Sequence, residues 1–159
     1  MRLLFIGQAP SRESDGQPPF TGRCGKFLAE LLGTTQEQML LDHDFINVLD
    51  TWPGKGPGGD KFPMIEAKAQ ASRKLDQLRG RRAVMLGHNV SRAFGGERFT
   101  YLSTYDVRNP ENFADRVCLA TVVPHPSGRN RFFNREENRM IVAKLLREMA
   151  DSTQESKQL

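Results

Sequence analysis

The chain has 159 residues, 38% of them hydrophobic and 26% charged, which is the composition of one folded domain rather than of a disordered chain. Its mean hydropathy of -0.55 argues against a membrane span. The formal net charge of +4 and the sequence pI of about 9.3 permit a polyanionic partner without requiring one.

Cys24 and Cys118 are the only cysteines, and their wide separation excludes a disulfide framework and a four-thiolate metal site. We interpret them as two small buried thiols of a reducing compartment, and we expect no metal and no other cofactor. The apolar run within residues 1–6 is too short for a signal peptide, so we expect a cytoplasmic protein.

Four short apolar runs predict buried strands, because runs without polar alternation are typical of a parallel sheet covered on both faces. The runs are residues 2–6, 45–49, 83–86 and 117–123. Residues 99–107 are β-prone but partly polar, so we interpret them as an edge strand or a long loop. The prolines and glycines of residues 50–63 predict a loop.

Helical periodicity falls between and after these strands. It predicts helices over residues 26–32, 65–78 and 89–94, and a last helix that begins near Asn134 with Glu137 in a capping box. The expected buried stripes are Ile65, Ala69, Ser72, Leu75 and Leu78 on one helix and Ile141, Leu145 and Met149 on another.

This alternation predicts an α/β fold, a three-layer α/β/α sandwich with a central, mainly parallel four-stranded sheet. We expect residues 1–150 to form one domain and residues 151–159 to form a polar tail.

The unusual segments of the chain follow the predicted strands, where an open parallel sheet binds its ligands. They are GQAP at residues 7–10, PFTG at 19–22, NVLDTWPG from Asn47, AVMLGHNVSRAFG from Ala83 and HPS at 125–127. In this order they resemble the uracil-DNA glycosylase superfamily, which has G-Q/E-x-P after its first strand and H-P-S after its last. The resemblance covers residues 3–147 and is nearest to the branch whose first motif is GEAPG.

The resemblance implies a pocket for a nucleobase that has been flipped out of the DNA. It assigns stacking on the base to Phe20, hydrogen bonding to the base edge to Asn47, and backbone contacts of the first-motif loop to Gln8 and Ala9. The alternative for Phe20 is a core residue, although the prolines before it and Gly22 after it indicate a loop. The alternative for Asn47 is a structural hydrogen bond.

Breaking the N-glycosidic bond places negative charge on the leaving base, so a donor aimed at pyrimidine O2 lowers the barrier. The resemblance assigns that donor to His125, for which a neutral imidazole suffices, and gives Gln8 a part in arranging the site. The alternative for His125 is a loop histidine fixed between two prolines.

Two departures from the superfamily pattern bear on catalysis. The best-known members carry an Asp that orients the attacking water at the position of Ala9, so we expect Glu13 or Asp15 to hold the water instead. The cysteines that bind an iron-sulfur cluster in the GEAPG branch are absent, which predicts no cluster.

Ser11 bears on the substrate. Enzymes of the superfamily that exclude a 5-methyl group have a bulky Tyr there, so a serine predicts room beside C5 of the pyrimidine. Thymine or a larger 5-substituted base is therefore a candidate substrate.

The segment after HPS is a predicted DNA contact, because superfamily members use it as a wedge in the base stack. The expected DNA-binding residues are Ser127, Arg129, Asn130, Arg131 and Phe132. One of the two phenylalanines, Phe132 or Phe133, could instead attach the following helix to the core.

Together these features predict a monofunctional DNA glycosylase that acts as a monomer on a flipped pyrimidine nucleotide and leaves an abasic site. The alternatives are a non-catalytic module that binds DNA or a modified base on the same fold, and a hydrolase of free nucleosides or nucleotides. Fold alone does not decide among them.

Overall fold

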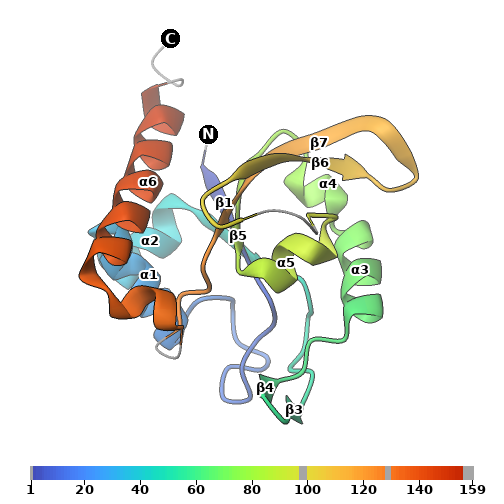
Figure 1. The fold of residues 1–159 in the computed structure, drawn as a ribbon, viewed down its shortest axis with the longest axis horizontal. Helices are drawn as coiled ribbons and strands as arrows, with labels where there is room; N and C mark the ends of the chain where they lie inside the picture. The colour runs from blue at the N-terminus through green and yellow to red at the C-terminus, as the bar shows by residue number, and fades with distance from the viewer. Residues whose placement is uncertain (1, 97–99, 128–129, 156–159) are drawn as a thin grey trace.

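The fold is organised around one mixed sheet, as Figure 1 shows. A computed structural model describes residues 2–96, 100–127 and 130–155, the last three of them by their backbone alone. The five strands follow the order β2-β1-β5-β7-β6, and all neighbouring pairs are parallel except β6 with β7. The strands are β1 (Leu3–Gly7), β2 (Asp44–Asn47), β5 (Arg82–Leu86), β6 (Thr104–Asn109) and β7 (Asn112–Val123).

The central strands form because they are apolar on both faces. In β1, Leu4 and Ile6 pack into the core on one side of the sheet, while Leu3 and Phe5 pack into the core on the other side. Both cores exclude water from β1, which explains a continuous apolar run in place of alternation. The prediction of an α/β fold with a mainly parallel sheet is confirmed.

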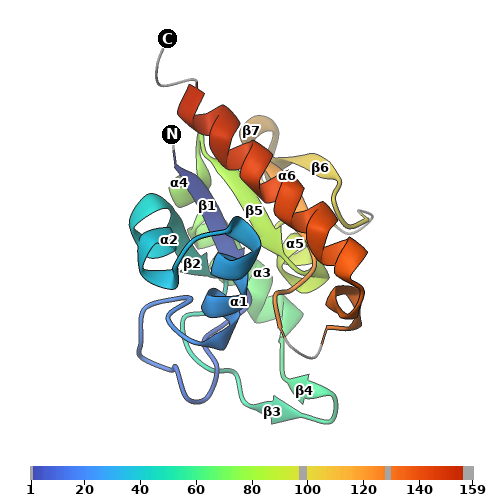
Figure 2. The same cartoon turned by 90° about the vertical axis from the view of Figure 1, so that its left-hand side faces the viewer.

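Helices cover both faces of the sheet and give the three predicted layers (Figures 1 and 2). One layer holds α1 (Arg23–Leu32), α2 (Gln36–Asp42) and α6 (Glu136–Glu155). The other layer holds α3 (Met64–Arg73), α4 (Leu75–Leu78) and α5 (His88–Ala93). No helix within the described ranges is both long and apolar enough to span a bilayer.

The number of strands and the buried face of one helix differ from the sequence prediction. The sheet has five strands rather than four, because the partly polar β6 pairs with β7 at the edge of the sheet. The helix predicted over 65–78 buries Ala67, Ala71 and Leu78, whereas Ile65 is 90% exposed. Small alanines pack close to the sheet, so the larger side chain did not mark the buried face.

The last helix begins at Glu136, and a 3-10 turn, η1 (Arg131–Asn134), precedes it. Its buried residues are Val142, Leu146 and Met149, while Ile141 is half-exposed. The helix continues through Glu155 and so includes the first part of the segment predicted as a tail. The short helix α2 had no sequence prediction.

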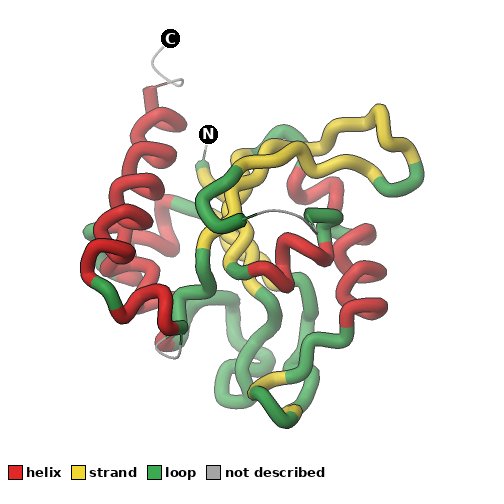
Figure 3. The backbone as a smooth tube through the Cα atoms, viewed as in Figure 1, coloured by secondary structure: helices red, strands yellow, loops and turns green. Residues whose placement is uncertain are grey.

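Loops gather at the carboxyl end of the parallel strands (Figure 3). They include residues 8–22 after β1 and the glycine-rich segment 50–63, which contains a two-residue hairpin, β3 (Lys55–Gly56) and β4 (Gly59–Asp60). All the predicted site residues that the structure describes lie at this end, since each follows or ends a strand.

Candidate nucleobase site at the carboxyl end of the sheet

Phe20 and Asn47 meet over the last residue of β1. A Cβ atom built on Gly7 would lie 2.6 Å from Asn47 Oδ1 and 2.8 Å from Phe20 Cζ. Gly7 is also the strand partner of Asn47 in the β1–β2 register. Only glycine lets the ring and the amide approach the backbone this closely. The aromatic ring and the polar amide that the sequence predicts for one pocket therefore lie side by side.

The backbone of Phe20 is held in an unusual conformation. Its φ is +62°, a left-handed value that non-glycine residues rarely adopt. Gln36 Nε2, from α2, donates hydrogen bonds to the carbonyls of Phe20 (2.8 Å) and Gly22 (3.0 Å). A Cβ on Gly25 would lie 1.8 Å from the Phe20 carbonyl oxygen, so this position also requires glycine. Helices α1 and α2 thus fix the loop that presents the ring.

The Phe20 ring continues a line of aromatic contacts from the core. Its centroid lies 5.5 Å from that of Phe45, which stacks on the buried Phe5 at 5.3 Å. Phe20 itself is only half-buried. One side of the ring is therefore supported by the core while part of it stays accessible at the loop.

Asn47 ends the edge strand β2, and its main chain is held from both sides. Val48 N–H donates to the Gly7 carbonyl at 2.9 Å. Lys74 Nζ donates to the carbonyls of Asn47 (2.8 Å) and Val48 (2.7 Å). Among the described residues the Asn47 side-chain amide has no hydrogen-bond partner. The main chain is fixed and the amide is left available.

His125 and Gln8 form a second cluster around Gly87, the residue after β5. A Cβ on Gly87 would lie 3.4 Å from His125 Cβ and 3.8 Å from Gln8 Nε2. Gly87 has a φ of +101°, and its N–H donates to the Val123 carbonyl at 2.7 Å. Since Gln8 directly follows Gly7, the two clusters occupy the ends of the neighbouring strands β1 and β5.

Burial lowers the pKa of His125 below its ordinary value of 6.5, so the imidazole is neutral at pH 7. Its main chain is fixed by a turn in which Ser127 N–H donates to the His125 carbonyl at 2.8 Å. Asn130 Nδ2 donates to the same carbonyl at 3.2 Å. A neutral imidazole can donate one hydrogen bond, which is the chemistry predicted for this residue.

Asn130 also begins η1, since its side-chain oxygen accepts a hydrogen bond from Phe132 N–H at 3.1 Å. Its side chain further bonds to Tyr101. The predicted DNA contact at Asn130 is thus a residue whose amide is used within the protein. Of the other predicted contacts, Ser127 is half-buried and Arg131 is exposed, while Arg129 lies outside the described residues.

The two phenylalanines of this segment have different environments. Phe133 is 5% exposed and packs edge-on against Phe27 at 5.1 Å, so it attaches the segment to the core. Phe132 is half-buried and touches Tyr101, with ring centroids 5.8 Å apart. Tyr101 also stacks on His88 at 4.2 Å. Phe132 is therefore the more accessible of the two.

The acidic loop after β1 carries the two carboxylates of which one is predicted to hold the water, Glu13 and Asp15. Asp15 Oδ1 accepts a hydrogen bond from the main-chain N–H of Trp52 at 3.2 Å, which connects this loop to the segment 50–63. Glu13 is exposed. Ser11 is also exposed, and its hydroxyl lies 2.8 Å from that of Ser14. Ala9 is half-buried and packs against the core beneath α3 and α5.

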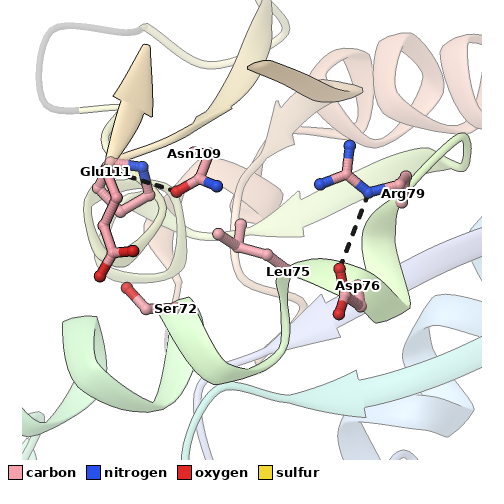
Figure 4. Close-up of a pocket in the computed structure, with 7 residues that line it drawn as sticks. Ser72, Leu75, Asp76, Arg79, Asn109 and Glu111 are labelled. Carbon is pink, nitrogen blue, oxygen red and sulfur yellow. Dashed lines mark hydrogen bonds and ion pairs between the residues drawn. The ribbon is translucent and has the colours of Figure 1, made fainter. Parts of the chain in front are cut away.

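A hollow of about 230 Å³ lies elsewhere, between α3, α4 and the turn joining β6 to β7 (Figure 4). Its arginine, Arg79, already pairs with Asp76 and Asp115. Within the described ranges, no group of three or more His, Cys, Asp or Glu side chains could hold a metal ion. Cys118 is buried as expected, and burial raises the pKa of its thiol to about 11, whereas Cys24 is only half-buried.

The sequence motifs led to Phe20, Asn47, Gln8 and His125, but not to the residues that support them. Gln36, Lys74 and Tyr101 lie on segments that read as ordinary helix or loop. Gly87 stands in a quoted motif and Gly25 does not, and the reason for glycine at both positions emerges only from the packing.

Comparison of the chain with known protein families gives a match that covers both clusters. The family model described as Uracil DNA glycosylase superfamily matches residues 1–149. No curated protein matches the chain. The predicted resemblance is confirmed for the superfamily, while the nearness to the GEAPG branch stays a prediction.

Proposed function

The chain belongs to the uracil DNA glycosylase superfamily, and we propose that it is a monofunctional DNA glycosylase for uracil or a 5-substituted pyrimidine. It hydrolyses the bond between the base and deoxyribose and leaves an abasic site. The observation that carries this proposal is the meeting of Phe20 and Asn47 at Gly7, beside His125 and Gln8 at Gly87. A ring, an amide and a neutral imidazole at the ends of two neighbouring strands suit one planar polar ligand.

In this mechanism the target nucleotide leaves the stack and its base enters the site. Phe20 stacks on the base, and the Asn47 amide bonds to its Watson–Crick edge, because one acceptor and two donors match O4 and N3–H of uracil. Gln8 and Ala9 contact the base through the loop backbone. Since the Phe20 and Asn47 backbones are fixed beforehand, less ordering is needed when the base enters.

His125 donates to the developing charge on pyrimidine O2 as the glycosidic bond breaks. A donor that is already in place stabilises this charge without reorganisation. The neutral state that burial favours is sufficient for one donated hydrogen bond. Glu13 or Asp15 holds the attacking water. Asp15 also bonds to the loop of Trp52, so Glu13 is the carboxylate of the two with no such tie among the described residues.

No lysine nucleophile is part of this mechanism, which is why we propose a glycosylase without lyase activity. Lys74, the lysine nearest Asn47 by its hydrogen bonds, uses its ammonium group on three oxygens. An ammonium group has three donors, and all three are paired within the protein, so none is free to bind a substrate.

Binding to DNA involves the segment after His125. Arg129 and Arg131 meet phosphates, Ser127 donates to another, and Phe132 enters the stack. Asn130 contributes by holding the turn. We propose that one copy of the chain acts alone on its DNA.

The small and exposed Ser11 supports a substrate with a substituent at C5. A panel of duplexes carrying uracil, mismatched thymine, 5-hydroxymethyl and glucosylated pyrimidines tests this. Excision of uracil alone would reject the 5-substituted class.

A second candidate is a non-catalytic module that binds DNA or a modified base. The observation that favours it is Ala9, which packs against the core where the best-known members of the superfamily carry an Asp. This module would need no carboxylate to hold a water.

The deciding experiment measures abasic sites as alkali-induced strand cleavage, on single- and double-stranded DNA from the panel above. Cleavage by the natural chain and its loss in His125→Ala would support the glycosylase and identify its base. DNA binding without cleavage of any substrate would favour the module.

A further inference from the structure

Two side chains outside the motifs bind the main chain of the two residues that face Gly7. Lys74 lies where α3 ends and α4 begins, and Gln36 is the first residue of α2. Lys74 binds the carbonyl of Asn47, and Gln36 binds the carbonyl of Phe20. We call these contacts the Lys74 clamp and the Gln36 clamp.

The Lys74 clamp uses every donor of the ammonium group. Nζ lies 2.8 Å from the Asn47 carbonyl, 2.7 Å from the Val48 carbonyl and 2.6 Å from Asp50 Oδ1. The side chain of Lys74 is 14% exposed, whereas that of Asp50 is 74% exposed. Burying an ammonium group is costly unless all its donors are paired, so this geometry strongly favours one position of the chain after β2.

The edge position of β2 explains why such a clamp is needed. The strand pairs only with β1, so its outer carbonyls have no neighbouring strand to bond. Lys74 takes the place of that missing strand at Asn47, the last residue of β2. Without it, the end of the strand would be free to twist away from Gly7 and carry the amide with it.

The Gln36 clamp acts on a backbone that is intrinsically unfavourable. Phe20 has a φ of +62°, and a backbone of this kind persists only where surrounding contacts enforce it. Gln36 Nε2 supplies two such contacts, to Phe20 and Gly22. Loss of the amide would release the ring from its orientation over Gly7.

We propose that Lys74 and Gln36 are positioning residues with separate duties, Lys74 for reading the base edge and Gln36 for stacking on the base. This inference rests on the proposed function. A displaced Asn47 amide mispairs with the base edge, which affects one base more than another. A displaced ring weakens stacking, and stacking is tolerant of base identity.

The test compares Lys74→Met with Gln36→Leu in single-turnover excision. Each variant is given the base that the natural chain prefers and the base with the other Watson–Crick edge, for example uracil and cytosine in the same duplex. We expect Lys74→Met to lower the preference between the two bases about tenfold. Gln36→Leu should lower both rates by a similar factor and leave their ratio within about twofold.

Two controls separate positioning from general stability. Lys144→Met makes the same chemical change at an exposed lysine of α6 that pairs with Glu148, so rates and ratio should stay the same. Asp50→Asn removes the exposed carboxylate but keeps an acceptor, and it should preserve the ratio because the two carbonyl contacts remain. If Lys74→Met does not fold, Lys74→Gln is measured in its place.

The inference is overturned if the Lys74 variant excises both bases with the natural ratio, or if the Gln36 variant changes that ratio as much as the Lys74 variant does. Failure of the proposed function has a different signature. In that case the natural chain itself excises no base from any substrate.

Discussion

The two ends of the parallel sheet differ in what their polar side chains leave free for a ligand. At the amino end, charged groups pair with one another: Arg81 contacts Asp44 at 2.6 Å, and Arg116 contacts Asp106 at 2.8 Å. At the carboxyl end, Lys74 and Gln36 bind main-chain carbonyls, and Lys74 also pairs with Asp50. The side-chain amide of Asn47, whose main chain Lys74 holds, has no partner within the described ranges.

This difference separates stability from function within one sheet. A polar group whose partner lies in the same chain is satisfied before any ligand arrives, and it contributes to folding alone. A polar group on a fixed backbone that lacks a protein partner is available to a ligand, and its geometry is set in advance. The comparison predicts large effects on activity at the carboxyl end and small effects on stability at the amino end.

The largest effect is expected from His125→Ala. Removal of one donor aimed at a developing charge should lower the single-turnover rate about 100- to 1000-fold. Affinity for DNA should change little, because phosphate contacts supply most of it. Rates and filter-binding affinities on the same duplex measure both. An equal loss of rate and of affinity would show that His125 acts in binding instead.

Gly7→Ala should have the next largest effect. The new Cβ would lie 2.6 Å from Asn47 Oδ1 and 2.8 Å from the Phe20 ring, so both must move. We expect excision to fall about 10- to 100-fold, with a loss of unfolding free energy on the order of 1–3 kcal/mol. Chemical denaturation and single-turnover rates provide the two numbers.

The matched control is Gly16→Ala, a loop glycine with open space around its Cβ position. Its φ of +83° makes the substitution strained, so it too should lose some stability. It should keep its excision rate. Equal losses of rate in the two variants would contradict the role of crowding at Gly7.

The next effect in size is the contribution of the buried His125 to the pH dependence of stability. Burial lowers the pKa of both His125 and His43 in the folded chain, so below pH 6.5 the unfolded chain binds protons that the folded chain does not. The free energy of unfolding should therefore have its full value above pH 6.5 and should decrease as the pH falls below 6.5. Urea denaturation at pH 7.5 and 5.5 measures the decline.

His125→Gln should make this decline smaller, and His43→Gln should do the same independently. An unchanged decline in His125→Gln would mean that the imidazole is as free to bind a proton in the folded chain as in the unfolded one.

Arg81→Met should have the smallest effect. The pair with Asp44 is partly exposed, so its loss should cost about 1 kcal/mol or less. Excision should stay at the natural rate, since Arg81 stands at the other end of β5 from Gly87. A thermal melt and one rate measurement suffice, and a clear loss of rate would contradict the separation of the two ends.

The sequence predicted the strands and the loops that end them because buried parallel strands and their glycine or proline stops are local signals. Gln8 directly follows Gly7 and His125 directly follows Pro124, whereas Phe20 and Asn47 were identified through the family resemblance. The signal over residues 99–107 was weaker and left an edge strand or a long loop open, and pairing with β7 makes β6 the edge strand.

The supporting residues could not be predicted for a different reason. Lys74 and Gln36 act across 27 and 16 residues of sequence, on main-chain atoms that carry no sequence signature. The error at Ile65 has a related origin, because periodicity identifies a face only when the larger apolar residues are the buried ones. Contacts between segments far apart in sequence determine both the supporting residues and the buried face of α3.

Trp52 has a practical consequence for following the protein at work. It is the only tryptophan in the chain, and its main-chain N–H donates to Asp15 while the guanidinium of Arg12 lies 5.9 Å from the centre of its ring. The intrinsic ultraviolet emission of the protein therefore comes mainly from this one indole. Any movement of the loop after β1 against the segment 50–63 changes the surroundings of that indole, so stopped-flow emission can time the loop without an added dye.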